Sequence, residues 1–205
     1  NTIFGTQFKE VPNTSVPLVC DMSSDIFSKK IDVSKFDLIY AGAQKNLGPA
    51  GATLYIVKDE IFDRNRIQIP TMLNLKTHID KDSMFNTPPV YSIYVSMLNL
   101  RHLKKIGGIE AQQKINEEKA RILYAEIDSN PLFKGVAAKE DRSNMNVTFV
   151  LTDESKQPKF DEMWQAANIS GIKGHRSVGG YRASMYNALP VSSVQVLVDV
   201  MNSLS

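Results

Sequence analysis

Three short apolar runs near the start of the chain constrain its fold more than any other feature. They cover residues 17–20, 36–40 and 53–57. A short, continuous apolar run bounded by turn residues is typical of a strand that is buried on both faces. Such strands occur in sheets covered by helices, so the three runs predict part of an α/β fold.

The rest of the chain alternates between helical and strand patterns. A helical pattern at residues 90–106 ends at Gly107 and Gly108, because glycine commonly terminates helices. Further predicted segments are a helix at 109–128, strands at 136–138, 145–151 and 181–185, and helices at 160–168 and 191–204. This order predicts a small α/β domain. We therefore place one domain at residues 1–107 and a smaller one at residues 108–205, which suits a chain of 205 residues.

One lysine, Lys45, follows the second apolar run and lies in a turn that contains Gly42, Gly48 and Gly51. Glycine lets the backbone turn tightly and lets a large group approach closely. One such group is a cofactor held covalently by the lysine amine. A plain glycine-rich turn explains the pattern as well, and the local pattern alone leaves both interpretations open.

An acidic residue, Asp21, ends the first run in the same way that Lys45 follows the second. In a parallel sheet both side chains would emerge at the carboxyl edge, where such sheets bind their ligands. The two groups could simply form an ion pair. Pyridoxal phosphate chemistry instead uses them separately, because the amine forms a Schiff base and the carboxylate keeps the pyridine nitrogen protonated.

A second group of charged side chains, His175, Arg176 and Arg182, flanks the glycine pair at 179–180. The planar guanidinium group binds carboxylate or phosphate through two hydrogen bonds, so the group suits a substrate with two anionic ends. A basic surface hairpin is an equally simple interpretation.

Composition argues against several other functions. The formal net charge is only +2, which gives no support to binding of nucleic acid or a membrane surface. No apolar run approaches the ~18 residues that span a bilayer. The single cysteine, Cys20, excludes an internal disulfide, fits a reducing, cytoplasmic compartment and is expected to pack as a small buried hydrophobe. No His, Cys or acidic residues have metal-ligand spacing, so we predict no metal site.

Four stretches, in order along the chain, resemble one enzyme family. They are residues 21–24 (DMSS), 43–51 (AQKNLGPAG), 85–89 (FNTPP) and 174–188 (GHRSVGGYRASMYNA), and the opening NTIFG also matches. The chain resembles the phosphoserine aminotransferases, which are class V, fold-type I enzymes that use pyridoxal 5'-phosphate. The resemblance implies that residues 1–107 are the C-terminal portion of the large cofactor-binding domain, which has a mostly parallel sheet with helices, and that residues 108–205 are the small C-terminal domain.

The resemblance also implies how the cofactor is held. Lys45 would be the Schiff-base lysine, and Asp21 would bind the pyridine nitrogen. Thr2 would hydrogen-bond the phenolic oxygen of the ring, and Gln44 would help to hold the phosphate.

Other residues would serve the partner subunit and the substrate. Asn86 and Thr87 would reach the cofactor phosphate of the neighbouring subunit, so that a homodimer shares each active site; local pattern alone favours helix capping for them. Arg182 would bind the substrate α-carboxylate. His175 and Arg176 would bind the phosphate or the distal carboxylate.

By this resemblance the complete enzyme would transfer the amino group of L-glutamate to 3-phosphohydroxypyruvate, giving O-phospho-L-serine and 2-oxoglutarate in serine biosynthesis. Some bacterial members also act on a phosphorylated hydroxythreonine precursor in pyridoxine synthesis. The family's N-terminal portion is not matched, so we expect a fragment that is inactive or weakly active alone. The alternatives are another class V enzyme, such as an alanine–glyoxylate type aminotransferase or a cysteine desulfurase, and a truncated chain without catalytic activity.

Overall fold

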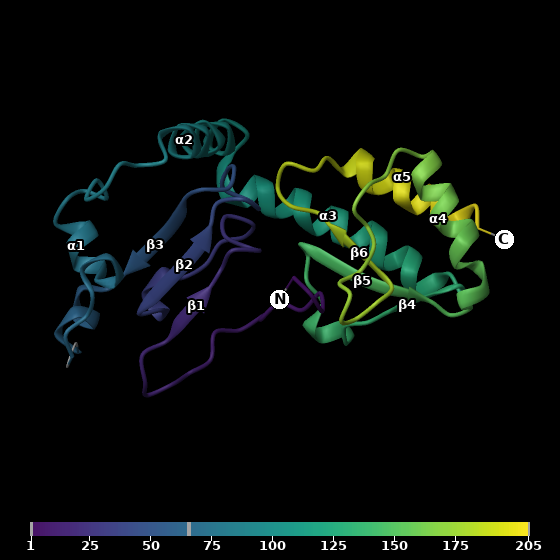
Figure 1. Ribbon diagram of the computed structural model, residues 1–205. Coiled ribbons are helices and arrows are strands. Elements are labelled where there is room, and N and C mark those ends of the chain that lie inside the picture. The colour runs from purple at the N-terminus through teal and green to yellow at the C-terminus, as the bar shows by residue number, and fades with distance from the viewer. Residues whose placement is uncertain (1, 65–66, 205) are drawn as a thin grey trace. The chain divides into compact units, whose positions relative to one another are not determined.

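The computed structural model describes residues 2–64 and 67–204, and the chain divides into two compact units (Figure 1). We call Pro12–Ile26 together with Ile31–His102 the Lys45 unit. Asn1–Val11, Phe27–Lys30 and Leu103–Ser205 form the Arg182 unit. The last boundary between the two units falls after His102. The domain boundary after residue 107 stays a prediction.

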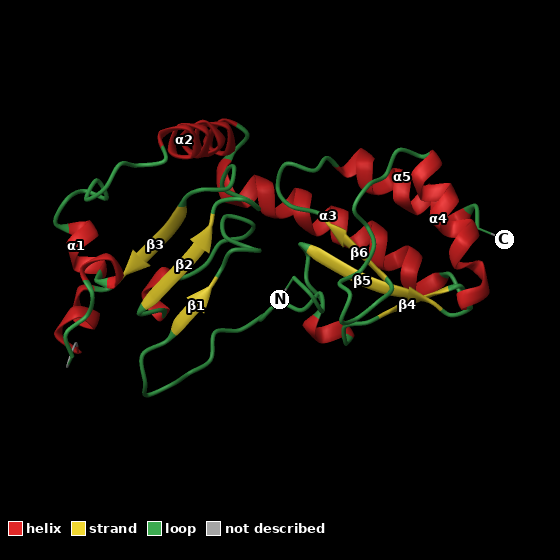
Figure 2. Ribbon diagram, viewed as in Figure 1, coloured by secondary structure: helices red, strands yellow, loops and turns green. Residues whose placement is uncertain are grey.

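The Lys45 unit contains a three-stranded sheet in the order β1-β2-β3. Its strands are β1 (Val19–Asp21), β2 (Leu38–Gly42) and β3 (Thr53–Val57) (Figure 2). Strands β1 and β2 are parallel, with Asp21 opposite Tyr40, and β3 is antiparallel to β2. The three apolar runs therefore do form neighbouring strands, and the carboxyl ends of β1 and β2 share one edge.

The expectation that all three strands are buried on both faces is wrong for β1 and β3. Val19 is 53% exposed and Tyr55 is 49% exposed, whereas Ile39 in the central strand is buried. Cys20, expected to be buried, is half-buried. A sheet buries both faces only where another layer covers each of them. Within the described residues, the outer strands lack part of that cover.

One long helix, α2 (Val90–Lys105), confirms the helix expected at residues 90–106. The other helical segments of the unit are short: η1 (Val33–Lys35), η2 (Asp59–Arg64), η3 (Thr71–Leu73) and α1 (Leu75–Ile79). Helix α2 buries two small polar side chains, Ser92 and Ser96, while Tyr91 is exposed. Its buried face is therefore narrow and polar.

The Arg182 unit combines three helices with an antiparallel sheet in the order β4-β5-β6 (Figure 1). Its elements are α3 (Gly108–Ser129), β4 (Phe133–Gly135), η4 (Lys139–Asp141), β5 (Asn146–Leu151), η5 (Glu154–Lys156), α4 (Gln157–Ala166), β6 (Tyr181–Ser184) and α5 (Val191–Asn202). The predicted α/β class is confirmed. The strand expected at residues 136–138 lies instead at β4, because Phe133 pairs with Leu151 of β5.

Aromatic side chains dominate the core of the Arg182 unit. The ring centres of Phe160 and Tyr181 are 4.9 Å apart in an edge-to-face contact, and the ring centres of Phe133 and Phe160 are 5.2 Å apart. Alternation along β6 turns Tyr181 toward this core and the next residue, Arg182, toward the opposite face of the sheet. The core thus fixes the strand that carries the candidate substrate residue.

Candidate active site

The parallel pairing of β1 and β2 brings Asp21 and Lys45 within electrostatic reach of each other. Burial alone would raise the pKa of Asp21. Hydrogen bonds from Ser23 and Tyr40, together with the Lys45 charge, outweigh burial and lower that pKa below its ordinary value. The backbone N–H of Ser23 donates to Asp21 Oδ1 at 2.8 Å. Asp21 is therefore ionised at neutral pH, as a carboxylate that binds a protonated ring nitrogen must be.

The turn that carries Lys45 is closed by backbone hydrogen bonds. The N–H of Ala43 donates to the carbonyl oxygen of Ala52 at 3.0 Å, and the N–H of Gly48 donates to that of Ala43 at 2.7 Å. Lys45 is half-buried, and the neighbouring Gln44 is exposed. The two interpretations of this stretch are therefore compatible, because a tight glycine-rich turn holds the lysine in place.

Asn86 and Thr87 lie just before α2, and both are exposed. The Asn86 side chain donates through Nδ2 to the carbonyl oxygen of Thr87 at 3.2 Å. Among the described residues, neither side chain accepts a hydrogen bond from a backbone N–H of α2. The capping role is thus not what the geometry shows, and both side chains are exposed at the surface of the Lys45 unit.

Arg182 lies on β6, opposite Thr148 of β5. Its side chain is half-buried, and its Nε is buried without a hydrogen-bond partner in the described part of the chain. No carboxylate of residues 2–64 or 67–204 pairs with its guanidinium group. A half-buried cation without an internal counter-ion is suited to binding an external carboxylate.

His175 and Arg176 lie in a hairpin that leads into β6. The N–H of Gly174 donates to the carbonyl oxygen of Gly180 at 2.8 Å, and His175 Nδ1 lies 2.7 Å from the hydroxyl of Ser177. Arg176 is exposed, and His175 is half-buried. The basic-hairpin interpretation therefore describes these two residues correctly, whereas Arg182 belongs to the sheet itself.

The segment that carries Thr2 crosses the same sheet face as Arg182, which the sequence did not reveal. Thr148, opposite Arg182, donates from its hydroxyl to the carbonyl oxygen of Phe4 at 2.8 Å. The left-handed Gly5 (φ 70°) lies so close to β5 that an added Cβ would be 2.7 Å from the carbonyl oxygen of Asn146. Only glycine fits there, and this contact places Thr2 and Arg182 in one unit.

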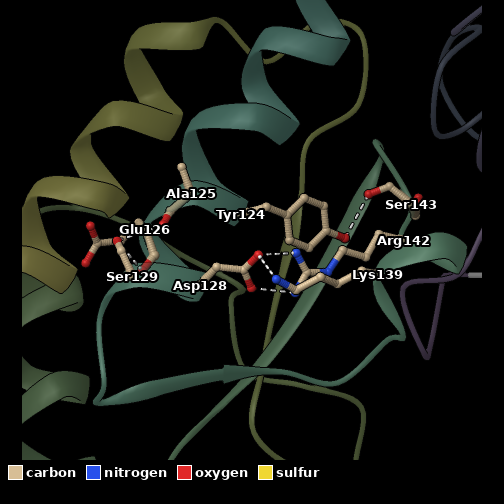
Figure 3. Close-up of polar contacts among 8 residues, drawn as sticks. All are labelled: Tyr124, Ala125, Glu126, Asp128, Ser129, Lys139, Arg142 and Ser143. Atoms are coloured by element: carbon tan, nitrogen blue, oxygen red, sulfur yellow. Dashed lines mark hydrogen bonds and ion pairs between the residues drawn. The ribbon is translucent and has the colours of Figure 1, made fainter.

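An ion-pair cluster supports the backbone on which this N-terminal segment lies (Figure 3). Arg142 donates two hydrogen bonds to the Asp128 carboxylate, at 2.7 and 2.8 Å, and its guanidinium group lies 4.4 Å from the centre of the Tyr124 ring. The hydrogen bond from Arg142 is the main reason that the pKa of Asp128 falls to about 2. The next residue, Ser143, donates from its N–H to the carbonyl oxygen of Gly5 at 2.9 Å. No local spacing in the sequence points to this cluster.

The described residues contain neither a candidate metal site nor a candidate membrane-spanning helix. Setting aside residues 1, 65, 66 and 205, no three or more His, Cys, Asp or Glu side chains form a group that could hold a metal ion. In the same part of the chain, every helix is too short or too polar to cross a bilayer.

The sequence profile described as aminotransferase class-V matches residues 3–197. The chain belongs to this family. It is 63% identical over 204 residues to the phosphoserine aminotransferase of Flavobacterium johnsoniae and 58% identical over 203 residues to that of Parabacteroides distasonis. The alignments cover 100% and 98% of this chain but 57% of each relative. The chain therefore spans a little over half the length of these aminotransferases.

Solved structures of class V aminotransferases have the same fold. The phosphoserine aminotransferase from Bacillus circulans subsp. alkalophilus is 43% identical with a TM-score of 0.92, and the match covers 100% of this chain and 57% of that one. A pyridoxal-phosphate-bound phosphoserine aminotransferase from Trichomonas vaginalis is 35% identical with a TM-score of 0.93, and the match covers 99% and 58%. The chain is thus part of a fold-type I transferase fold, as its motifs predicted.

Proposed function

We propose that the protein to which this chain belongs is a phosphoserine aminotransferase. It would transfer the amino group of L-glutamate to 3-phosphohydroxypyruvate, giving O-phospho-L-serine and 2-oxoglutarate for serine biosynthesis. The observation that carries the proposal is the pair Asp21 and Lys45, which the parallel strands β1 and β2 place at one sheet edge. The names of relatives that are 58% and 63% identical support the substrate assignment.

The residues present fit pyridoxal 5'-phosphate as the cofactor. Asp21 is held ionised beside Lys45, as a partner for a protonated pyridine nitrogen should be. Gln44 is exposed at the same turn and can donate its amide N–H groups to a phosphate without adding charge. When bound, pyridoxal phosphate supplies an aldehyde that takes up amino groups and a ring that withdraws electrons.

The chain's own groups would divide the work as follows. Lys45 would hold the cofactor between turnovers and, once released, carry the proton at the substrate α-carbon. Asp21 would keep its negative charge against the ring nitrogen throughout. Thr2 would donate its hydroxyl hydrogen to the phenolic oxygen, and the contacts of Gly5 would hold its segment in place.

Substrate recognition would depend on the Arg182 unit. Arg182, which has no internal carboxylate partner among the described residues, would bind the α-carboxylate. His175 and Arg176 would bind the phosphate or the distal carboxylate. A phosphorylated hydroxythreonine precursor offers the same two anionic ends, so the site would also suit that reaction of pyridoxine synthesis. Alanine–glyoxylate aminotransfer and cysteine desulfuration have no need for this second basic group.

Further proposals concern assembly and location. Asn86 and Thr87, exposed before α2, would bind the cofactor phosphate of a second subunit in a homodimer. Residues 1–107 would belong to the large domain and residues 108–205 to the small one. The enzyme would work in the cytoplasm. Because the chain spans 57% of its relatives, we propose that these 205 residues alone transaminate weakly or not at all.

Absorbance spectroscopy tests the cofactor assignment. Adding pyridoxal phosphate to the chain should produce a visible band, because the covalently bound cofactor is yellow. The Lys45→Ala variant should show no such band, whereas the Lys81→Ala variant, changed at an exposed lysine, should keep it. A band that persists in Lys45→Ala, or that never forms in the complete protein, would refute the assignment.

A further inference from the structure

We propose that Ser92 and Asn99 on α2 are positioning residues that set the location of the Lys45 amine, and that Gly48, by carrying no side chain, lets α2 lie against the turn at Ser96. Their contacts are with the turn that carries this lysine. The proposal rests on the proposed function for what Lys45 binds, but the positioning of its amine can be measured independently. All the residues concerned lie in the Lys45 unit.

Helix α2 approaches the turn closely at Gly48. A Cβ added there would lie well inside 3.0 Å of the Ser96 hydroxyl oxygen, and 3.2 and 3.3 Å from Ser96 Cα and Cβ. Gly48 does not have a positive φ, so its backbone conformation would accept alanine. The glycine is therefore needed for space, not for backbone freedom, and the serine is what fills that space.

Two hydrogen bonds from α2 hold the carbonyl groups of the turn. Ser92 donates its hydroxyl to the carbonyl oxygen of Ala50 at 2.7 Å, and Asn99 donates Nδ2 to that of Leu47 at 3.0 Å. Turn carbonyls have no regular partner, so such contacts determine where the backbone lies. Helix α2 thus holds the part of the turn that follows Lys45.

The turn cannot absorb a displacement at one end, because its two ends are tied together. Ala43, two residues before Lys45, bonds both to Ala52 and to Gly48 through the backbone. Leu47, within the turn, is buried. A shift at Gly48 must therefore be passed to Lys45, and a displacement of ~1 Å can cost a reacting group about a hundredfold in rate.

A double-mutant cycle between Gly48 and Ser96 tests the proposal. Gly48→Ala forces the added methyl against the serine hydroxyl. Ser96→Ala removes that hydroxyl, which has no hydrogen-bond partner among the described residues and so contributes little by itself. In the double variant, the Cβ added at position 48 would lie 3.2 and 3.3 Å from the Cα and Cβ of residue 96. These contacts are tight but tolerable. His102→Ala, changed at an exposed α2 residue, is the control.

The first readout is the rate of acetylation of Lys45 by acetic anhydride, measured by peptide mass spectrometry relative to exposed Lys81 in the same chain. This rate depends on the position and surroundings of the amine and needs no cofactor. We expect Gly48→Ala to change the ratio by at least about threefold, Ser96→Ala and His102→Ala to leave it within about 1.5-fold, and the double variant to restore it. Asn99→Ala should change the ratio in the same direction as Gly48→Ala.

The second readout is the rate at which pyridoxal phosphate becomes attached to Lys45, trapped by borohydride. Gly48→Ala should slow it about tenfold or more, with recovery in the double variant. Thermal unfolding, followed in parallel, should show all variants folded. A folded Gly48→Ala chain with unchanged acetylation, or a double variant without recovery, would overturn the proposal. If acetylation follows the expected pattern but the cofactor never attaches in the complete protein, the proposed function fails and the positioning role stands.

Discussion

The two units of the chain bury their apolar side chains to different degrees. In the Arg182 unit, Phe149 and Phe160 are fully buried in an aromatic core. In the Lys45 unit, Tyr55 is 49% exposed and Val90 is 67% exposed. Exposed apolar groups of this kind mark surface that another protein layer normally covers. We infer that the Arg182 unit carries its own core, whereas the Lys45 unit needs cover that the described residues do not provide.

The largest expected effect contrasts the two units in stability. Phe160→Ala should lower the free energy of unfolding by about 3–5 kcal/mol, because it opens a cavity in a closed core. Tyr55→Ala should cost about 1 kcal/mol or less, since half of that side chain is already in water. Urea unfolding measured by circular dichroism gives both values, and the only tryptophan, Trp164, reports the Arg182 unit separately. Equal losses for the two variants would contradict the comparison.

A smaller effect concerns Arg182 in the complete protein. Replacing it with alanine should weaken L-glutamate binding about tenfold to a hundredfold, which is the range for losing hydrogen bonds to a charged group. Isothermal titration with the cofactor bound would measure the change. Arg101→Ala, at an exposed arginine of α2, is the matched control and should bind as the unchanged protein does. Unaltered affinity in Arg182→Ala would mean that the carboxylate binds elsewhere.

The Arg142 cluster should contribute to stability in a pH-dependent way. Arg142→Ala should cost about 1–3 kcal/mol at neutral pH, because it leaves the Asp128 carboxylate without its bidentate partner. The pKa of Asp128 is about 2 in the folded chain, below its ordinary value of 3.8. The stability that this ion pair provides is therefore present above about pH 4 and is lost as the pH falls toward 2.

The measurement for this cluster is urea unfolding of both chains at several pH values. The difference between the unchanged chain and Arg142→Ala should shrink steadily below about pH 4. Lys139→Ala is the control, since that lysine is 74% exposed and should change stability by less than about 0.5 kcal/mol. A difference that stays constant from neutral to strongly acidic pH would show that the ion pair does not act as described.

A pH-dependent effect at the alkaline end is expected from Lys119, a fully buried lysine of α3. It donates to the carbonyl oxygens of Met185 and Tyr186, both at 2.9 Å, and burial lowers its pKa to about 8 from 10.5. The folded chain binds fewer protons than the unfolded chain between these two values, so this lysine should add stability as the pH rises from 8 to 10.5. Unfolding of Lys119→Met, compared with the unchanged chain, should lack that rise. Parallel pH dependence in both chains would contradict the lowered pKa.

Features that depend on local sequence were predictable in the Lys45 unit. The three apolar runs indicated neighbouring strands, and the ends of two of them predicted that Asp21 and Lys45 share one sheet edge. The long helix ending near Gly107 was also correct to within a residue. These features follow from periodicity and turn chemistry, which a single sequence contains.

Features that depend on distant partners were not predictable. The strand expected at residues 136–138 lies at Phe133–Gly135, because pairing with β5 and not local propensity decides its position. The role of Gly48 depends on Ser96, and the conformation of Gly5 depends on β5. The exposure of Val19 was missed because an apolar run gives no sign of whether a covering layer is present in the same chain.

The central claim is that Lys45, among all the lysines of the chain, holds pyridoxal phosphate. It is tested most directly by incubating the complete protein with the cofactor, reducing with borohydride and mapping the label by peptide mass spectrometry. We predict one label per chain on the peptide that contains Lys45, and none on that peptide in Lys45→Arg. A label spread over exposed lysines such as Lys81, with none at Lys45, would contradict the account.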